Sequence, residues 1–210
     1  MNINNTIIKR GRPAKSGRSS SQTKQALVKS GVEYFTEFGF AASGLDPILK
    51  KVSVPKCYFY HYFANKEAFG IAVIQEYSHY FAKKLDLHLL NKANKPLVRI
   101  ENFANDAKAG MTRHNFQRGC LIGNLEQEVT LLPESHRQQL LDTFDIWQKK
   151  IACCLQLAQQ EGAINTALDC NRLASFFWMG WEGAIAKSKL TKNLRPIDTF
   201  ISSFLQLIVK

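Results

Sequence analysis

Apolar residues recur at helical spacing along almost the whole chain, and residues that favour turns or helix ends separate these repeats. The sequence lacks the alternation typical of strands joined by Asn-Gly or Asp-Gly turns. The predicted fold class is therefore all-α, with about nine helices. Their expected ranges are about 21–38, 43–52, 55–63, 65–90, 97–111, 120–131, 133–160, 170–188 and 196–209.

Particular residues predict several of these boundaries. Gly39 and Gly162 are expected to end helices, because glycine readily adopts the backbone angles found just after a last turn. Ser43-Gly44-Leu45-Asp46 resembles a capping box in which Asp replaces Glu. Asn65 is expected to cap the fourth helix, and Pro55 suits the first turn of the third.

Residues 54–66, VPKCYFYHYFANK, concentrate aromatic side chains. On a helical wheel Phe59, Tyr62 and Phe63 share one face and are the expected core anchors. The opposite face carries Lys56, Cys57, Tyr58, Tyr60 and His61. A short helix, a tight turn and a helix with such a surface predict a helix-turn-helix, whose second helix fits a DNA major groove. The alternative is that Tyr58, Tyr60 and His61 pack against the rest of the chain.

Charge is uneven along the 210 residues. The net charge is +11, and residues 1–70 hold 11 of the 28 Lys and Arg but only 4 of the 17 Asp and Glu. A basic end suggests a polyanionic partner there. The predicted organisation is a disordered basic arm over residues 1–20, a helix-turn-helix DNA-binding domain over 21–65, and a ligand-binding and dimerisation domain over 66–210.

Composition narrows the class of protein. With 45% hydrophobic residues, the chain is expected to be globular. No apolar run approaches the roughly 18 residues of a membrane span, so no membrane partner is expected. The N-terminus lacks the apolar segment of a signal peptide. A cytoplasmic location is therefore expected, and the five cysteines are expected to be thiols.

Residues 34–69, YFTEFGFAASGLDPILKKVSVPKCYFYHYFANKEAF, resemble the DNA-binding domain of TetR-family transcriptional regulators. The resemblance implies a homodimer that docks one recognition helix on each half-site of a double-stranded DNA operator. The family commonly has Gly and then Ser or Thr where this chain has Cys57 and Tyr58, a departure at the groove-facing start of the helix. The expected DNA-binding residues in this region are Ser43, Lys56, Cys57, Tyr58, Tyr60, His61 and Lys66.

Arg10-Gly11-Arg12-Pro13 in the arm resembles the core of an AT-hook. Arg10 and Arg12 are expected to enter a narrow A·T-rich minor groove, where the negative potential is strong. The alternative is a solvated basic tail that adds nonspecific affinity.

RGCLIGNLEQE (118–128) and FWMGWEGAI (177–185) resemble the acrylate-utilisation regulators of the TetR family. This resemblance implies a repressor that a small unsaturated acid or a related electrophile releases from DNA. No cofactor and no metal are expected. The expected ligand-binding residues are His114, Arg118, Cys120, Asn124, Glu128, Trp147, Trp178 and Trp181.

The chemistry of these two stretches leaves alternatives open. Cys120 is predicted at a helix N-terminus beside Arg118, where the dipole and the guanidinium favour a thiolate, but buried thiols are often inert. The polar stripe from Cys120 to Glu128 can equally be a solvated face, and the tryptophans can be core. A face of small residues, Gly180, Ala184 and Ser188, suits the close approach of a second helix at a dimer seam.

Other classes of protein are less well supported. The sequence contains no motif of a serine hydrolase, a zinc protease, a P-loop or a dinucleotide-binding site, so an enzyme is not expected. His79, His88, His114 and His136 lack the spacing of a metal site. The sequence leaves open activation rather than repression, and redox or electrophile sensing through a thiol rather than reversible binding.

Overall fold

The computed structural model describes residues 18–209, so Arg10 and Arg12 lie outside the described residues. Within this range the chain is helical, and the only strand-like pairing is one antiparallel bridge between Ile164 and Val209. The all-α prediction is confirmed. The described helices are α1 (Ser20–Phe38), α2 (Leu45–Val52), α3 (Lys56–Phe59), α4 (Lys66–Leu89), α5 (Pro96–Arg113), α6 (Leu121–Gln127), the 3-10 helix η1 (Val129–Leu131), α7 (Glu134–Gln160), α8 (Cys170–Thr191) and α9 (Arg195–Ile208).

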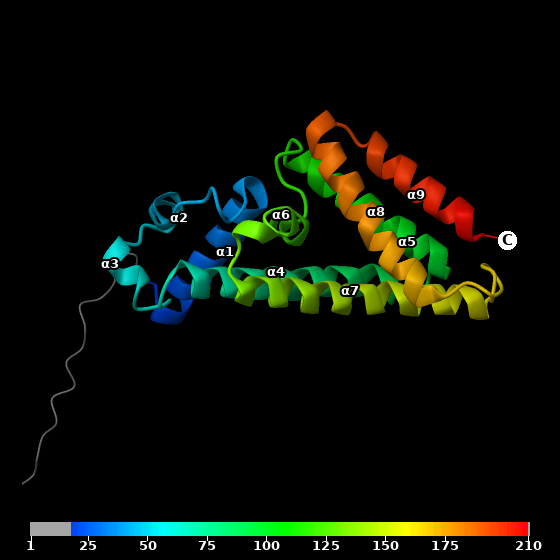
Figure 1. The fold of residues 1–210 in the computed structure, drawn as a ribbon, viewed down its shortest axis with the longest axis horizontal. Coiled ribbons are helices and arrows are strands. Elements are labelled where there is room, and N and C mark those ends of the chain that lie inside the picture. The colour runs from blue at the N-terminus through cyan, green and yellow to red at the C-terminus, as the bar shows by residue number, and fades with distance from the viewer. Residues whose placement is uncertain (1–17, 210) are drawn as a thin grey trace, which may run out of the picture.

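Helices α1, α2 and α3 gather at one end of the molecule, and α4 leads from them into the larger C-terminal part (Figure 1). There α4 lies beside α7, α8 packs on α7, and α9 packs on α8. The short helix α6 contacts α1 as well as α4, α7 and α8. It therefore connects the helix-turn-helix with the C-terminal part.

Local chemistry explains where the helices begin and end. Ser19 caps α1 with a capping box that the sequence analysis did not identify: its Oγ accepts from the Gln22 N–H at 3.2 Å, and the Gln22 side chain accepts from the Ser19 N–H at 2.8 Å. Asn65 caps α4, as predicted. Gly39 and Gly162 follow the ends of α1 and α7 with φ of 78° and 74°, which confirms both predicted ends.

The capping box predicted at Ser43 is wrong. Helix α2 begins after Gly44, which has no side chain to cap it, and Ser43 is buried. The Ser43 hydroxyl donates to the Gly39 carbonyl oxygen at 2.5 Å and so closes the turn after α1. Because its side chain is buried there, Ser43 is out of reach of DNA. The prediction that Ser43 contacts DNA is therefore wrong.

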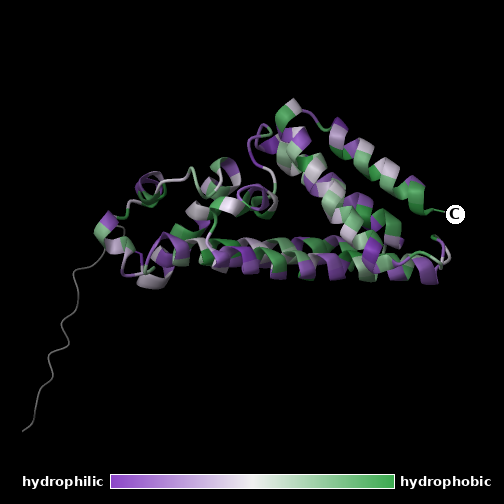
Figure 2. Ribbon diagram, viewed as in Figure 1, coloured by the Kyte–Doolittle hydropathy of each residue, from purple (hydrophilic) through white to green (hydrophobic). Residues whose placement is uncertain are grey.

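Aromatic rings fill the core of the C-terminal part. Trp147 stands between Phe81 and Trp178, with ring centroids 4.3 and 5.2 Å away, and Trp181 lies 4.9 Å from Phe103. In Figure 2 the long helices α4 and α7 carry hydrophobic and hydrophilic residues on different sides, as amphipathic helices do. No helix among the described residues is both long and apolar enough to cross a membrane.

The small-residue face of α8, formed by Gly180, Ala184 and Ser188, was expected to contact a second chain but packs within its own chain. The ring of Phe200 from α9 lies so close to Gly180 that a Cβ there would collide with it, and both Ala184 and Ser188 are buried. The expectation that this face forms a seam between two chains is wrong at Gly180, where the last helix of the same chain packs against it.

Candidate DNA-binding helix and ligand cavity

The aromatic stretch has two sides, as predicted. Phe59 and Phe63 are buried, whereas Tyr58 and Tyr60 are 44% and 55% exposed. Lys56, Cys57 and His61 are also exposed. The alternative in which Tyr58, Tyr60 and His61 pack against the rest of the chain is wrong for the described structure, so these groups remain available to a partner.

Helix α3 is shorter than expected. After Phe59 the backbone tightens, because His61 N–H bonds to the Tyr58 carbonyl oxygen and Tyr62 N–H bonds to that of Phe59, a spacing of three residues. The turn nevertheless keeps Tyr60 and His61 on the outside.

The two lysines of the expected DNA contacts differ in their surroundings. Lys56 pairs with Asp46 at 3.2 Å, but both side chains are well exposed and such a pair holds the ammonium only weakly. Lys66 instead donates to the Phe40 carbonyl oxygen at 2.7 Å, and its Nζ lies 4.3 Å from the centroid of the Phe40 ring. Burial lowers the pKa of Lys66, although the nearby Glu128 opposes this change. The bond to Phe40 uses one of the three N–H groups of this ammonium, so donors remain for a phosphate.

A cavity of about 220 Å³ lies among α1, α4, α5, α8 and the loop between α5 and α6. Its cationic and imidazole groups come from Lys84, Arg113, His114 and Arg118, and in the described part of the chain no Asp or Glu lines it. Trp181 and Ile185 of α8 contribute apolar surface. The cavity therefore combines positive charge with an apolar wall, which suits a small organic anion.

A cluster of three polar groups lies where Cys120 closes this cavity. The Cys120 thiol lies beside Glu182 and Tyr77, and all three residues are buried. Burial raises the pKa of the Cys120 thiol well above its usual value, and the neighbouring Glu182 raises it further. The expectation of a thiolate is wrong, because Arg118 points its guanidinium at α1 instead of neutralising the sulfur.

Glu182 has an unusual environment for a carboxyl group. It is 9% exposed, and its Oε1 has no hydrogen-bond partner among residues 18–209. Burial raises its pKa from 4.5 to about 8. At neutral pH the side chain is therefore mostly the neutral acid, which lowers the cost of enclosing it.

The structure brings four of the expected ligand-binding residues together. His114, Arg118, Cys120 and Trp181 all line the cavity. Trp147 and Trp178 belong to the aromatic core and are not among the lining residues. These two rings are part of the hydrophobic core, which was the alternative to ligand binding.

Asn124 and Glu128 turn towards the helix-turn-helix instead. The Asn124 amide donates to the Thr36 carbonyl oxygen at 2.6 Å. Glu128 Oε2 accepts from the backbone N–H groups of Phe40 and Ala41 at 3.0 and 2.8 Å. These two residues of the expected polar stripe are therefore not directed into the cavity: they fasten α6 and its C-terminal end to the end of α1.

Four residues of the site were not expected from the sequence: Tyr77, Lys84, Arg113 and Glu182. Glu182 had a usable signal, since it is a lone acid inside the apolar run FFWMGWEGAIA. Lys84 and Arg113 had none, because each occupies an ordinary polar position of an amphipathic helix. Within residues 18–209 no three His, Cys, Asp or Glu side chains come together as a metal site would need.

An N-terminal helix-turn-helix with an exposed polar and aromatic second helix, joined to a helical part that encloses a cavity, defines a DNA-binding transcriptional regulator. Residues 96–204 match the family model described as "Tetracyclin repressor-like, C-terminal domain". The chain belongs to the TetR family of transcriptional regulators.

Individual relatives agree with this assignment. The transcriptional regulator AcuR of Cereibacter sphaeroides is 42% identical over 93% of this chain and 89% of its own length. The transcriptional repressor DhaR of Mycobacterium sp. strain GP1 is 33% identical over 85% of this chain and 88% of its own. These relatives are regulators rather than enzymes, as expected from the sequence.

Solved structures give the same fold. A regulatory protein TetR from Rhodobacter sphaeroides aligns with a TM-score of 0.87 at 42% identity, covering 89% of this chain and 99% of that one. The reduced form of Escherichia coli NemR aligns with a TM-score of 0.82 at 24% identity, covering 90% of this chain and 97% of that one.

Proposed function

We propose that this protein is a repressor that binds its operator as a homodimer and releases it when a small unsaturated carboxylate enters the cavity. The observation that carries the proposal is the lining of the cavity, which presents three cationic side chains and His114 but no acid. A carboxylate forms its strongest hydrogen bonds with such groups. Acrylate is the proposed effector, because residues 118–128 and 177–185 resemble the acrylate-utilisation regulators.

The size of the cavity supports a small effector. Its volume of about 220 Å³ lies below the roughly 300–1,000 Å³ typical of sites for drug-sized molecules. The cationic groups would hold the carboxylate, while Trp181 and Ile185 would cover the carbon atoms. The protonated state of Cys120 supports reversible binding rather than rapid covalent capture, since the thiolate is the nucleophile.

Electrophile sensing is a second candidate function, and one observation favours it. Cys120 is buried but lines the cavity, so a molecule that enters comes close to this residue. In that case the effector would add covalently to Cys120.

Gel shifts on DNA flanking the protein's own gene test the proposal with three small molecules. Acrylate should release the DNA, and propionate should do so more weakly, because it has the same charge but no double bond. Acrylamide, which keeps the double bond and lacks the charge, should have little effect. Release by acrylate and acrylamide alone, with a mass increase on Cys120, would instead establish covalent sensing. If none of the three releases bound DNA, the proposed effector class is wrong.

Cys120→Ser should bind DNA normally but respond less to acrylate, because the change alters the cavity wall. Cys153→Ser is the matched control, since this cysteine is exposed on α7 and should leave the response unchanged. Intact-protein mass spectrometry should find no stable adduct on either protein. An undiminished response of Cys120→Ser would remove Cys120 from the site.

The proposed homodimer has a suitable surface on α8 and α9. Phe176, Met179 and Leu190 are exposed along one side of α8, and Gly183 on the same side has open space beside it. Leu207 on α9 is also exposed, and the last turn of that helix is hydrophobic in Figure 2. TetR-family regulators bind DNA operators as dimers, and an apolar stripe of this kind supports association of two copies.

Tyr60→Phe should weaken operator binding several-fold, because it removes one hydroxyl that can bond a phosphate, a loss of about 1 kcal/mol. The salt dependence should not change, since no charge is lost. Tyr80→Phe is the control: Tyr80 is 56% exposed, close to the 55% of Tyr60, but lies on α4. Fluorescence anisotropy at several salt concentrations gives both quantities. Equal affinities for wild type and Tyr60→Phe would contradict the proposed docking.

A further inference from the structure

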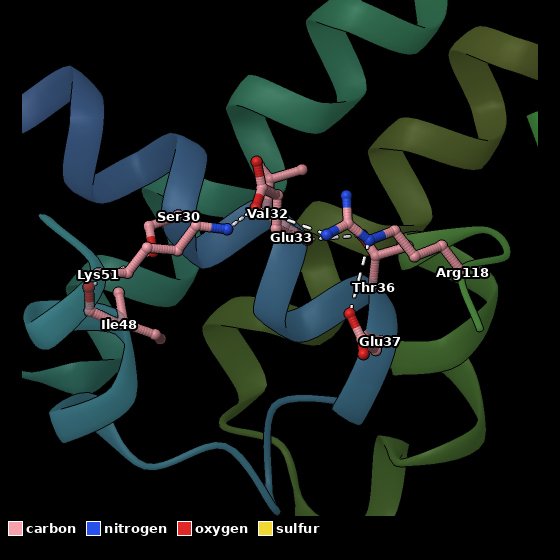
Figure 3. Close-up of polar contacts among 8 residues, drawn as sticks. All are labelled: Ser30, Val32, Glu33, Thr36, Glu37, Ile48, Lys51 and Arg118. Atoms are coloured by element: carbon pink, nitrogen blue, oxygen red, sulfur yellow. Dashed lines mark hydrogen bonds and ion pairs between the residues drawn. The ribbon is translucent and has the colours of Figure 1, made fainter. Parts of the chain in front are cut away.

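Arg118 lies at both the cavity and helix α1. It lines the cavity from the loop between α5 and α6, and its guanidinium also reaches α1. There Nη2 lies 3.5 Å from Glu33 Oε2 and Nε lies 3.6 Å from Glu37 Oε2 (Figure 3). Among the cationic side chains that line the cavity, it is the one that the structure pairs with the helix-turn-helix.

Glu33 is in turn shared with the helix-turn-helix. The Lys51 ammonium of α2 bonds the same Oε2 that faces Arg118, so one carboxylate stands between α2 and the cavity loop (Figure 3). A second hydrogen bond joins α1 and α2, in which Ser30 Oγ donates to the Ile48 carbonyl oxygen at 3.4 Å. Any shift of α1 at Glu33 is therefore passed on to α2, which packs against α3.

The ion pairs of Arg118 with Glu33 and Glu37 are weak enough for an anion to displace the two carboxylates. Strong bonds between a guanidinium and a carboxylate measure about 2.7–2.9 Å, whereas both contacts of Arg118 are longer. The three side chains are each about one quarter to two fifths exposed, so solvent weakens the pairs further. A carboxylate inside the cavity would offer the same guanidinium a closer partner in a more enclosed place.

The other contacts between α6 and α1 would persist. Asn124 and Glu128 hold the end of α1 through Thr36, Phe40 and Ala41, and none of these bonds involves Arg118. Loss of the Arg118 pairs would therefore free α1 near Glu33 while its C-terminal end stays attached. The expected change is a tilt of α1 with α2 and α3, not their detachment.

We infer that Arg118 is the coupling residue between the cavity and the DNA-binding helices, and that an anionic effector releases DNA by drawing its guanidinium away from Glu33 and Glu37. This inference rests on the proposed function, because it needs an anion in the cavity. Coupling is reciprocal: whatever strengthens the Arg118 pairs weakens effector binding by the same factor, and the reverse.

The double variant Glu33→Gln/Glu37→Gln tests the inference by calorimetry with propionate in the absence of DNA. Propionate should bind the variant several-fold more tightly than wild type, because no carboxylate of α1 then competes for Arg118. In DNA-binding assays, propionate should release the variant by a smaller factor than wild type; allosteric factors are commonly about 5–150-fold. Each single variant should give an intermediate result, which provides a second measurement if the double variant folds poorly.

Glu76→Gln/Glu101→Gln is the matched control, with the same loss of two negative charges at α4 and α5 positions outside the Arg118 pairs. It should bind propionate like wild type. An affinity for propionate that is unchanged in Glu33→Gln/Glu37→Gln, or raised equally in the control, would overturn the inference and leave the proposed function intact. Failure of both propionate and acrylate to bind wild type would overturn the proposed function and the inference with it.

Discussion

Glu182→Gln should be more stable than wild type at about pH 8.5, by as much as about 5 kcal/mol, and the difference should shrink to about 1 kcal/mol or less at about pH 5. Burial raises the pKa of Glu182 from 4.5 to about 8, a change of about 3.5 units, and each unit corresponds to about 1.4 kcal/mol. Thermal unfolding of the two proteins at both pH values measures the difference.

The direction of this change in stability with pH follows from whether the folded or the unfolded state ionises first. The carboxyl of the unfolded chain loses its proton near pH 4.5, whereas the folded chain keeps it until about pH 8. Between these values the unfolded state gains free energy from ionisation that the folded state cannot, so stability falls as the pH rises. Glutamine is neutral at every pH and does not share this loss.

Glu101→Gln, at an exposed position of α5, is the matched control and should track wild type at both pH values. A gap between Glu182→Gln and wild type that is equal at both pH values would contradict the prediction. It would mean that the change acts through shape or hydrogen bonding and not through ionisation.

Gly31→Ala should lower the free energy of unfolding by about 1–3 kcal/mol, because it overfills the contact between α1 and α4. A Cβ at Gly31 would stand 2.5 Å from Phe69 Cζ and 2.6 Å from Val73 Cγ2. Both neighbours are fully buried, so moving either one would disturb the packing of the core. Urea unfolding followed by circular dichroism measures the loss.

Gly110→Ala supplies the comparison, since it is the same substitution within another helix. Apart from the backbone of its own helix and its two chain neighbours, no atom of residues 18–209 lies within 4 Å of the position that its Cβ would take. It should therefore stabilise the protein by up to about 1 kcal/mol, the difference in helix propensity between Gly and Ala. If both variants shifted the stability in the same direction, the tight contact at Gly31 would not be the cause.

Local signals in the sequence predicted much of the fold. Gly39, Asn65 and Gly162 mark helix boundaries through the conformation or hydrogen bonds of a few neighbouring residues. The exposed side of residues 56–61 followed from helical periodicity alone. Ser43 was misread because two residues in succession, Ser and Gly, both suit the start of a helix, and only the bond from Ser43 to Gly39 decides between them.

The candidate site was less predictable because it depends on contacts between distant segments. Arg118 and Glu33 are 85 positions apart, and nothing near either residue shows that they meet. Cys120 was expected to be a thiolate from its neighbour in sequence, but its neighbour in space is Glu182 from α8, which has the opposite effect. Gly180 was expected to meet another chain, and only the path of α9 shows that Phe200 occupies its surface.

The length of α4 turns a small rotation into a large displacement. Its 24 residues span about 36 Å, with α3 close to its start, whereas α8 and α9 with the proposed dimer face occupy the half of the molecule away from α3 (Figure 1). For a lever arm of that length, a tilt of about 5° moves the tip by about 3 Å, close to the 3.4 Å rise between successive bases. Two such arms that swing apart would miss their half-sites by nearly two steps of the double helix, so a change of a few degrees at the cavity suffices to break the register on DNA.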